Sequence, residues 1–208
     1  MLDTKVLSID DPKAIPIAKQ IIEDHGLIAF PTDTIYGVAG DPFNTTAIQQ
    51  IYAVKERPQD KALPVLIGEL CQLKDLVMSV SMLTRRIAEA FWPGALTLVL
   101  LKGSKIPLDL SPYPTIGVRM PDLDFTLRLL TEIGPLAATS ANISDGPNST
   151  TAEEVLAQLG GRIDLVLDGG PTHGPMASTV VDATGPELIL LREGPISLAA
   201  LNARINKE

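Results

Sequence analysis

Short apolar runs suited to buried strands alternate with segments of helical periodicity along the whole of this chain. The run 27–32 has the length and composition of a strand, whereas the segment 12–25 places Ile15, Ala18 and Ile22 at helical spacing. Such alternation is typical of an α/β domain, in which helices cover the faces of a sheet. Because the runs in the last third follow one another without helices between them, we expect a mixed rather than a purely parallel sheet.

The same patterns predict the order of the elements. We expect strands or strand-like apolar runs at 6–9, 27–32, 62–67, 96–101, 115–119, 136–139, 164–167, 178–182 and 188–191. We expect helices at 12–25, 69–77, 82–91, 122–133, 151–161 and 198–205, together with one that Asn44 caps and that carries Lys55 and Arg57 at its C-terminal end. No linker, repeat or low-complexity stretch interrupts this order, so we expect one domain over residues 1–208.

Length and composition are those of a protein with an ordinary apolar core. The chain has 208 residues, 45% of them hydrophobic, and folding at this length buries about 70% of the surface of the unfolded chain. The single cysteine, Cys71, excludes an internal disulfide framework and suits a reducing compartment. The two histidines, His25 and His173, are too few for a zinc site, so we expect no protein-held metal.

The chain shows no signal for membrane insertion. Its first residues lack the basic and apolar regions of a leader, and no apolar run approaches the roughly 20 residues of a membrane span. We therefore expect a cytoplasmic protein with no membrane partner. A net charge of -8 argues against a broad basic surface that binds nucleic acid without sequence preference, although a local basic patch is compatible with it.

A local group of cations stands out against this acidic total. Lys55, Arg57 and Lys61 lie at the end of a predicted helix and in the turn after it. They cannot share one helix face, but they can converge on an anion from a loop, and a nucleotide triphosphate is the obvious candidate. The alternative is a solvated basic turn at the negative end of the helix dipole.

Hydroxyl groups follow two predicted strands at the positions where α/β sheets commonly place ligand groups. Thr32, Asp33, Thr34 and Tyr36 follow directly on the apolar residues 27–30, and Ser140-Ala141-Asn142 follows another strand. Each group has a plain structural alternative, namely a turn or a capping segment.

Two arginines at strand ends leave a similar choice. Arg119 and Arg192 could each clamp a carboxylate or a phosphate. Alternatively, Arg119 could pair with Asp122 or Asp124, and Arg192 with Glu193.

The chain lacks the P-loop, the dinucleotide-binding glycine motif and the hydrolase nucleophile elbow, so any use of ATP must proceed without a P-loop.

Taken together, these segments resemble the YrdC family of threonylcarbamoyl-AMP synthases over about residues 6–195. The residues that carry the resemblance are Pro31-Thr32-Asp33-Thr34-Ile35-Tyr36-Gly37, Lys55-Glu56-Arg57-Pro58 with Lys61, Trp92-Pro93-Gly94-Ala95-Leu96-Thr97, Val118-Arg119-Met120-Pro121, Ser140-Ala141-Asn142, Ser178-Thr179-Val180-Val181-Asp182 and Arg192-Glu193-Gly194. Seven elements in the same order make the match specific.

The resemblance implies an α/β fold with a YrdC-like twisted mixed β-sheet and flanking helices around a concave cleft. It implies a nucleotidyltransferase that joins L-threonine, bicarbonate and ATP into threonylcarbamoyl-AMP and pyrophosphate, for use by downstream tRNA-modifying proteins. Lys55 and Arg57 are then the expected catalytic residues. The implied nucleotide-binding residues are Arg57, Lys61, Thr115, Ser140, Asn142, Asn148 and Arg192, and the implied threonine-binding residues are Thr34, Arg119, Ala138 and Ser178.

The chain departs from the family pattern at Leu66, where some members carry a histidine near the amino acid. Because the sequence ends at Glu208, we expect no extra C-terminal domain like that of longer members. Mg²⁺ is expected on the triphosphate, held chiefly by substrate oxygens and water because the sequence offers no carboxylate cage. Two rival functions remain: an RNA-binding module that uses the same cations, and a carbamoyl-transfer domain like that of hydrogenase maturation proteins. The latter carries an acylphosphatase unit and zinc-binding cysteines, which this chain lacks.

Overall fold

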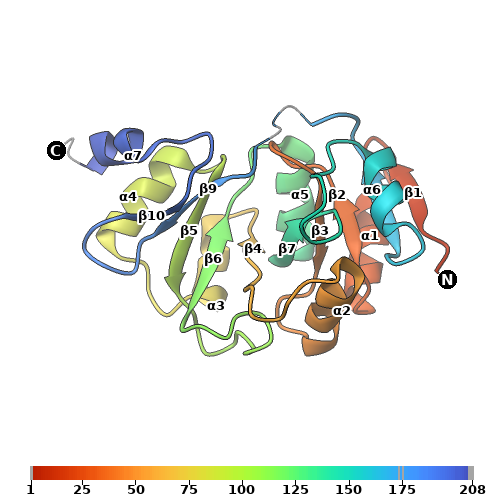
Figure 1. Ribbon diagram of the computed structural model, residues 1–208, viewed down its shortest axis with the longest axis horizontal. Helices are drawn as coiled ribbons and strands as arrows, with labels where there is room; N and C mark the ends of the chain where they lie inside the picture. Colours follow the sequence, from red (N-terminus) through yellow and green to blue (C-terminus); the bar gives the residue numbers. More distant parts are fainter. Residues whose placement is uncertain (1, 173, 175, 206–208) are drawn as a thin grey trace.

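The computed structural model describes residues 2–172, 174 and 176–205, so His173 lies outside the described residues (Figure 1). Its strands form one ten-stranded sheet in the order β1-β8-β2-β3-β7-β4-β6-β5-β9-β10. The strands are β1 (Lys5–Ser8), β2 (Ile28–Phe30), β3 (Gly37–Gly40), β4 (Val65–Leu66), β5 (Leu96–Leu101), β6 (Thr115–Arg119), β7 (Leu136–Ser140), β8 (Leu165–Asp168), β9 (Thr179–Asp182) and β10 (Ile189–Arg192).

The sheet is mixed, as the sequence predicts. β1 and β2 both pair parallel with β8, and β4·β6 and β5·β9 are also parallel. The pairs β2·β3, β3·β7, β4·β7, β5·β6 and β9·β10 are antiparallel. The expected α/β fold with a mixed sheet is thereby confirmed.

Helices cover both faces of the sheet. They are α1 (Ala14–Glu23), α2 (Thr45–Lys55), α3 (Leu73–Leu76), α4 (Met82–Phe91), α5 (Asp124–Ile133), α6 (Ala152–Leu159) and α7 (Leu198–Ile205). Figure 1 shows α4 and α7 at the end of the sheet that carries β10, with α1, α2, α5 and α6 around the other end.

The alternation of side chains along each strand divides the core into two clusters. In β2 and the residue before it, Leu27 and Ala29 pack with α2 and α6, whereas Ile28 and Phe30 pack with α1 and α5. Successive strand residues point to opposite faces, so a run that is apolar at every position must be covered on both sides. The first cluster continues under α3, α4 and α7.

The cap of α2 forms as expected. Asn44 Oδ1 accepts a hydrogen bond from the backbone N–H of Ala47 at 3.0 Å. The helix ends at Lys55, and Glu56 then adopts a left-handed conformation with φ 53°. Arg57 therefore lies in the loop beyond the helix, not on its last turn.

Two expectations about the elements were wrong. The strand β3 was missed, because its four residues follow the hydroxyl-rich turn without polar alternation and begin and end with glycine. The segment 69–77 is not one helix but a 3₁₀ turn, Leu70–Gln72, followed by the single turn α3.

Among the described residues, no helix combines the length and the apolar character that a membrane crossing needs.

Candidate functional site

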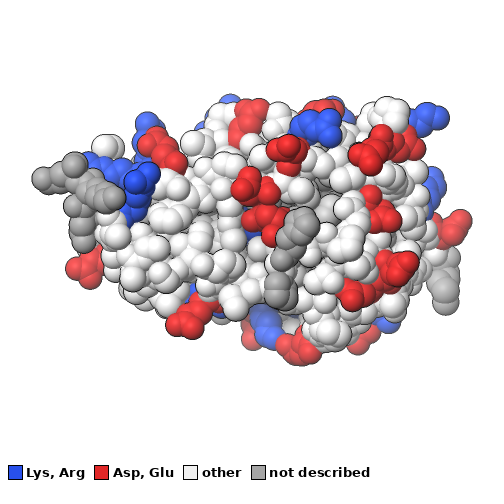
Figure 2. Space-filling model, turned by 90° about the horizontal axis from the view of Figure 1, so that it is seen from above, with Lys and Arg blue, Asp and Glu red and all other residues white. Residues whose placement is uncertain are grey.

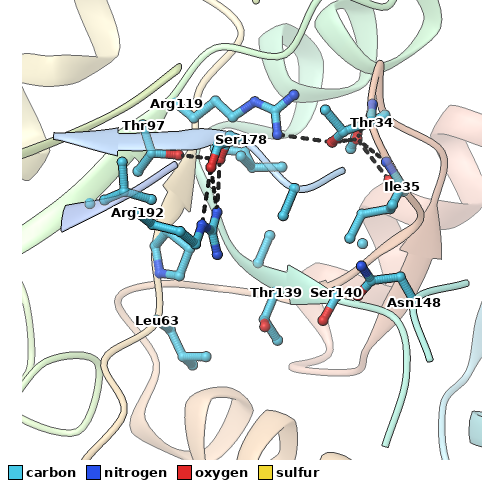
Figure 3. A pocket seen from close by; sticks show the side chains of 18 of the residues that line it. Thr34, Ile35, Leu63, Thr97, Arg119, Thr139, Ser140, Asn148, Ser178 and Arg192 are labelled. Carbon is cyan, nitrogen blue, oxygen red and sulfur yellow. Dashed lines mark hydrogen bonds between the residues drawn. The ribbon is translucent and has the colours of Figure 1, made fainter. Parts of the chain in front are cut away.

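A cavity of about 380 Å³ opens over the strands β7, β4, β6, β5 and β9 (Figure 3). It lies on the sheet face that α1 and α5 cover elsewhere, because Leu66 and Ala138 contribute both to its wall and to the cluster under those helices. Its lining includes Thr32, Thr34, Ile35, Tyr36, Arg57, Leu63, Leu66, Thr97, Val99, Gly117, Arg119, Ala138, Thr139, Ser140, Asn148, Ser178, Val180 and Arg192.

The pairing of β5 with β6 builds the floor of this cavity. Val99 lies opposite Gly117, and both line the cavity, whereas Leu98 lies opposite Val118 and both face the core. A Cβ atom at Gly117 would lie 3.0 Å from Thr97 Cγ2 and 3.4 Å from Pro64 Cβ. The glycine therefore leaves open a part of the floor that any other residue would fill.

The turn after β2 is fixed by the Thr32 hydroxyl. Thr32 Oγ1 accepts from the backbone N–H groups of Thr34 and Ile35 at 3.2 and 3.3 Å, and it donates to the Ile35 carbonyl at 2.7 Å. Because this donation uses its one proton, the 3.0 Å contact between the two threonine hydroxyls requires Thr34 to donate to Thr32.

Three segments hold Arg119 at the edge of the cavity. Its Nε–H donates to the Gly94 carbonyl at 3.0 Å, Nη1 donates to Thr34 Oγ1 at 3.0 Å, and Nη2 donates to Asp33 Oδ1 at 2.5 Å. Burial lowers the pKa of Arg119, and the Asp33 carboxylate opposes that effect. The proposed partners Asp122 and Asp124 were wrong, because Asp33 reaches Arg119 from the turn of a distant strand.

The contacts of the Thr34 hydroxyl determine whether it can donate a hydrogen bond to a ligand or accept one from it. Its proton is directed to Thr32 and one lone pair accepts from Arg119, so its remaining lone pair can only accept a hydrogen bond. A ligand group placed against Thr34 must therefore offer an N–H or an O–H.

Arg192 and Thr97 both contact Ser178 (Figure 3). Nε and Nη2 of Arg192 donate to the Ser178 carbonyl at 3.1 and 2.8 Å, and Nη2 also reaches Ser178 Oγ at 3.2 Å. Thr97 Oγ1 lies 2.8 Å from Ser178 Oγ. The hydrogen bonds of Arg192 therefore go to Ser178, and the alternative of a structural pair with Glu193 was wrong.

Arg57 also lines the cavity. Its Nε donates to the Lys61 carbonyl at 3.2 Å and Nη2 donates to the Ala62 carbonyl at 3.1 Å, so its own loop supports it. Burial lowers the pKa of Arg57. Lys61 lies outside the lining and forms an exposed pair with Asp145 at 3.5 Å.

Lys55 is almost completely buried, with 1% of its surface exposed, and it does not line the cavity. Its ammonium donates to the carbonyls of Ser140 and Asn142 at 2.6 and 2.5 Å and to Asn142 Oδ1 at 3.3 Å. The backbone N–H of Ser144 donates to the Lys55 carbonyl at 2.8 Å. The end of α2 thus fastens the segment 140–144, and burial, together with the nearby Arg57 charge, lowers the pKa of Lys55 to about 8.

The structure brings most of the expected site residues together. Thr34, Arg57, Arg119, Ala138, Ser140, Asn148, Ser178 and Arg192 all line the one cavity. Thr115 lies two residues before Gly117 and so on the same face of β6, beyond the lining. Asn142 is buried behind the wall, where its Nδ2 donates to the carbonyls of Ile143 and Gly146 at 2.9 and 2.8 Å.

Sequence reasoning missed the contributions of Asp33, Thr97 and Gly117. Asp33 stands between two threonines that suggest a turn, and its long-range partner leaves no sequence signal. Thr97 and Gly117 do leave one, because a hydroxyl stands in the apolar strand 96–101 and a glycine interrupts the strand 115–119.

The electrostatics of the cavity differ from those of the surface. Among its lining residues, three are arginines and none has a carboxylate side chain. Figure 2 shows acidic and basic side chains interspersed over another face, where acidic ones are spread widely. In the part of the chain that is described, no three His, Cys, Asp or Glu residues are grouped as a metal site would require. The cavity is therefore suited to anionic ligands.

Comparison with known proteins gives several matches. A family model for Sua5, YciO and YrdC proteins, described as "Telomere recombination", matches residues 20–194. The threonylcarbamoyl-AMP synthase of Bacillus subtilis (strain 168) is 39% identical over 205 residues, which cover 97% of this chain and 59% of that protein. A relative from Mycobacterium tuberculosis (strain H37Rv), which carries that name provisionally, is 37% identical, and the match covers 93% of this chain and 92% of the relative.

A solved structure has the same fold. The crystal structure of P. abyssi Sua5 complexed with L-threonine matches with a TM-score of 0.90 and 35% identity. The match covers 99% of this chain and 61% of the Sua5 chain. The chain thus spans about three fifths of two of these proteins and nearly all of the third.

Proposed function

Because the chain belongs to the Sua5, YciO and YrdC family, we propose that it is a threonylcarbamoyl-AMP synthase. In this proposal it joins L-threonine, bicarbonate and ATP into threonylcarbamoyl-AMP and pyrophosphate. Downstream proteins then transfer the threonylcarbamoyl group to adenosine in tRNA. The exposed free thiol of Cys71 suits a reducing compartment, and we place the reaction in the cytoplasm.

One observation carries the proposal: three arginines from different parts of the chain line one cavity that has no carboxylate in its described lining. The substrates bring a carboxylate, a bicarbonate and a triphosphate. A group of guanidinium ions in one cavity can bind several such groups at once, because hydrogen bonds between guanidinium ions and carboxylates or phosphates are charge-assisted and strong.

We assign the threonine to the part of the cavity around Arg119. The Arg119 guanidinium would bind the carboxylate, and the Thr34 hydroxyl would accept a hydrogen bond from the amine or the hydroxyl of threonine. Ala138 and Ser178 also line the cavity. Leu66 lines the cavity, so this position offers an apolar contact where some relatives would offer a histidine.

We assign the nucleotide to the part around Arg57. Arg57, Ser140, Asn148 and Arg192 line the cavity and are placed to contact ATP, and Lys61 stands near its rim beside Arg57. Contacts from Thr115 and Asn142 stay predictions, since neither residue lines the cavity.

Lys55 has its three protons directed at Ser140 and Asn142. We therefore propose that its first role is to hold the segment after β7 in place. A direct contact between Lys55 and a phosphate, as the family resemblance implies, would require it to release one of these acceptors.

The reaction needs no covalent intermediate with the protein. The threonine nitrogen attacks the carbon of carbon dioxide and loses a proton, forming a carbamate. If bicarbonate is attacked instead, a C–O bond of bicarbonate also breaks and water leaves. A carbamate oxygen then attacks the α-phosphorus, and the bond to pyrophosphate breaks. The protein would contribute positioning of the two reactants and stabilisation of the negative charge on the phosphates, chiefly from Arg57.

The cavity lining does not form a resident Mg²⁺ site, because Mg²⁺ prefers carboxylate ligands and the described lining has none. We propose that Mg²⁺ arrives with the triphosphate and is coordinated by its oxygens and by water. Arg57 and Arg192 would bind the phosphate oxygens that remain.

The RNA-binding alternative is not favoured. Non-specific RNA binding needs a continuous basic track along the surface. Here the net charge is -8 and the lining arginines sit in a small cavity.

The direct test is to incubate the purified protein with ATP, Mg²⁺, isotopically labelled bicarbonate and one amino acid at a time. Threonine should give pyrophosphate and a labelled acyl-adenylate that mass spectrometry identifies. Reactions without threonine, or with valine instead, serve as controls. If the folded protein forms no such product at any Mg²⁺ or bicarbonate concentration, the proposed activity is wrong.

A further inference from the structure

Asp33 forms an ion pair with Arg119, one of the three arginines that line the cavity. Among the residues that the structure describes, it is the one carboxylate within ion-pair distance of Arg57, Arg119 or Arg192. Its side chain is 15% exposed, that of Arg119 is 8% exposed, and Asp33 does not line the cavity. The carboxylate therefore lies behind the guanidinium and leaves the cavity side of Arg119 open to a ligand.

The hydrogen bonds of Arg119 leave part of its guanidinium available. An arginine has five N–H donors, and three of those of Arg119 are directed at Gly94, Thr34 and Asp33. One N–H on Nη1 and one on Nη2 have no acceptor within the described chain. Two donors on neighbouring nitrogens match the two oxygens of a carboxylate.

The backbone on both sides of Asp33 is fixed. The Thr32 hydroxyl accepts from the N–H groups of Thr34 and Ile35, and the Thr126 hydroxyl donates to the Pro31 carbonyl at 2.7 Å. The Gly94 carbonyl accepts from Arg119. The Gly94 N–H in turn donates to the carbonyl of Met120, the residue after Arg119, at 2.8 Å. The contacts of Arg119 are therefore set before any ligand arrives.

We infer that Asp33 is a positioning residue for substrate binding: it holds Arg119 so that the two remaining N–H groups face the threonine carboxylate. The inference rests on the proposed function in assigning that carboxylate to Arg119. Asp33 touches no substrate in this arrangement. Its effect should appear in the affinity for threonine and not in the affinity for ATP, which binds around Arg57.

The test compares Asp33→Ala and Asp33→Asn with the wild-type protein by measuring pyrophosphate release against threonine and against ATP. Asp33→Ala should raise the KM for threonine about tenfold, with the KM for ATP changed less than twofold. Asp33→Asn keeps an accepting oxygen of the same shape and should recover most of the threonine affinity. Asp75→Ala removes another ion pair, at 2.6 Å from Lys105 on the surface, and should change neither constant.

A rise below threefold in the KM for threonine, or an equal rise in the KM for ATP, overturns the inference. So does an Asp33→Asn variant that is as impaired as Asp33→Ala, because the accepting oxygen would then have no positioning effect. A wild-type protein that forms no product from threonine would refute the proposed function and not the bracing of Arg119.

A measurement without substrates tests the bracing itself. In ¹⁵N-labelled protein, the side-chain N–H signals of Arg119 can be identified by their loss in Arg119→Lys. They should exchange slowly with water in the wild-type protein and much faster in the Asp33→Ala variant, or in Asp33→Asn to a smaller degree. Equal exchange rates in wild type and both variants would show that Asp33 does not hold Arg119.

Discussion

Replacing Lys55 by methionine should remove a pH dependence of stability that the wild-type protein has. The ammonium of Lys55 is buried, and its pKa falls from 10.5 to about 8 on folding. Below pH 8 both folded and unfolded chains carry the proton, and the full cost of burying the charge opposes folding. Between pH 8 and pH 10.5 the folded chain has lost the proton while the unfolded chain keeps it, so stability rises with pH.

The size of the effect follows from the two pKa values. At about 1.4 kcal/mol per pKa unit, the fall from 10.5 to about 8 corresponds to about 3 kcal/mol. Methionine has a similar length and no proton to lose. The difference in unfolding free energy between wild type and Lys55→Met should therefore increase by about 3 kcal/mol from pH 7.5 to pH 10.5.

Urea unfolding of both proteins at several pH values measures this difference, and the titration of other lysines and tyrosines cancels in it. A difference that stays constant, or that falls as the pH rises, would refute the reasoning. It would mean that the hydrogen bonds to Ser140 and Asn142 stabilise the ammonium as much as burial destabilises it.

Three further substitutions test the assignments in the cavity. Arg57→Ala should lower kcat/KM for ATP about 10- to 100-fold, as expected for the loss of hydrogen bonds to a charged group; Lys105→Ala, a surface cation paired with Asp75, is the control, and an equal loss in both would contradict a specific role. Arg119→Ala should raise the KM for threonine at least tenfold without a matching change for ATP, and an unchanged threonine dependence would disprove the carboxylate assignment. Gly117→Val should fill the cavity floor and lower kcat/KM for threonine or ATP about tenfold or more, while circular dichroism and the melting temperature show a folded protein; full activity of that variant would place the substrates elsewhere.

Local patterns were enough to predict most of the fold. Asn44 predicts the start of α2 because a capping interaction lies within three residues of it. The strand β3 has no such local signal, since Gly37–Gly40 is stabilised by pairing with β2 and β7 on either side. Its conformation is set by neighbours distant in the sequence.

The charged residues of the cavity lining could also be predicted from local patterns, but the long-range contact of Arg119 could not. Charged and hydroxyl side chains at strand ends pointed to Thr34, Arg119 and Arg192, and the cations after a predicted helix pointed to Arg57. The cavity lining includes all four. The ion pair between Asp33 and Arg119 joins two strands that are not neighbours in the sheet, and the sequence favoured nearer carboxylates.

The burial of Lys55 could not be seen from the sequence either. A lysine at a helix C-terminus is usually exposed. Here the segment 140–144 folds over it and supplies the acceptors that a buried ammonium requires.

The order of the strands has a consequence for how the protein folds. Lys5 in β1 pairs with Leu165 in β8, and Leu96 in β5 pairs with Thr179 in β9. During synthesis, β1 and one edge of β5 stay without their strand partners until β8 and β9 leave the ribosome. Contacts between such distant segments also slow folding, because the entropy of closing a long loop is lost before the contact is gained. The part of the lining that includes Ser178 and Arg192 is thus the last part of the cavity to form, and the nascent chain acquires its binding site only after residues 178–192 have been synthesised.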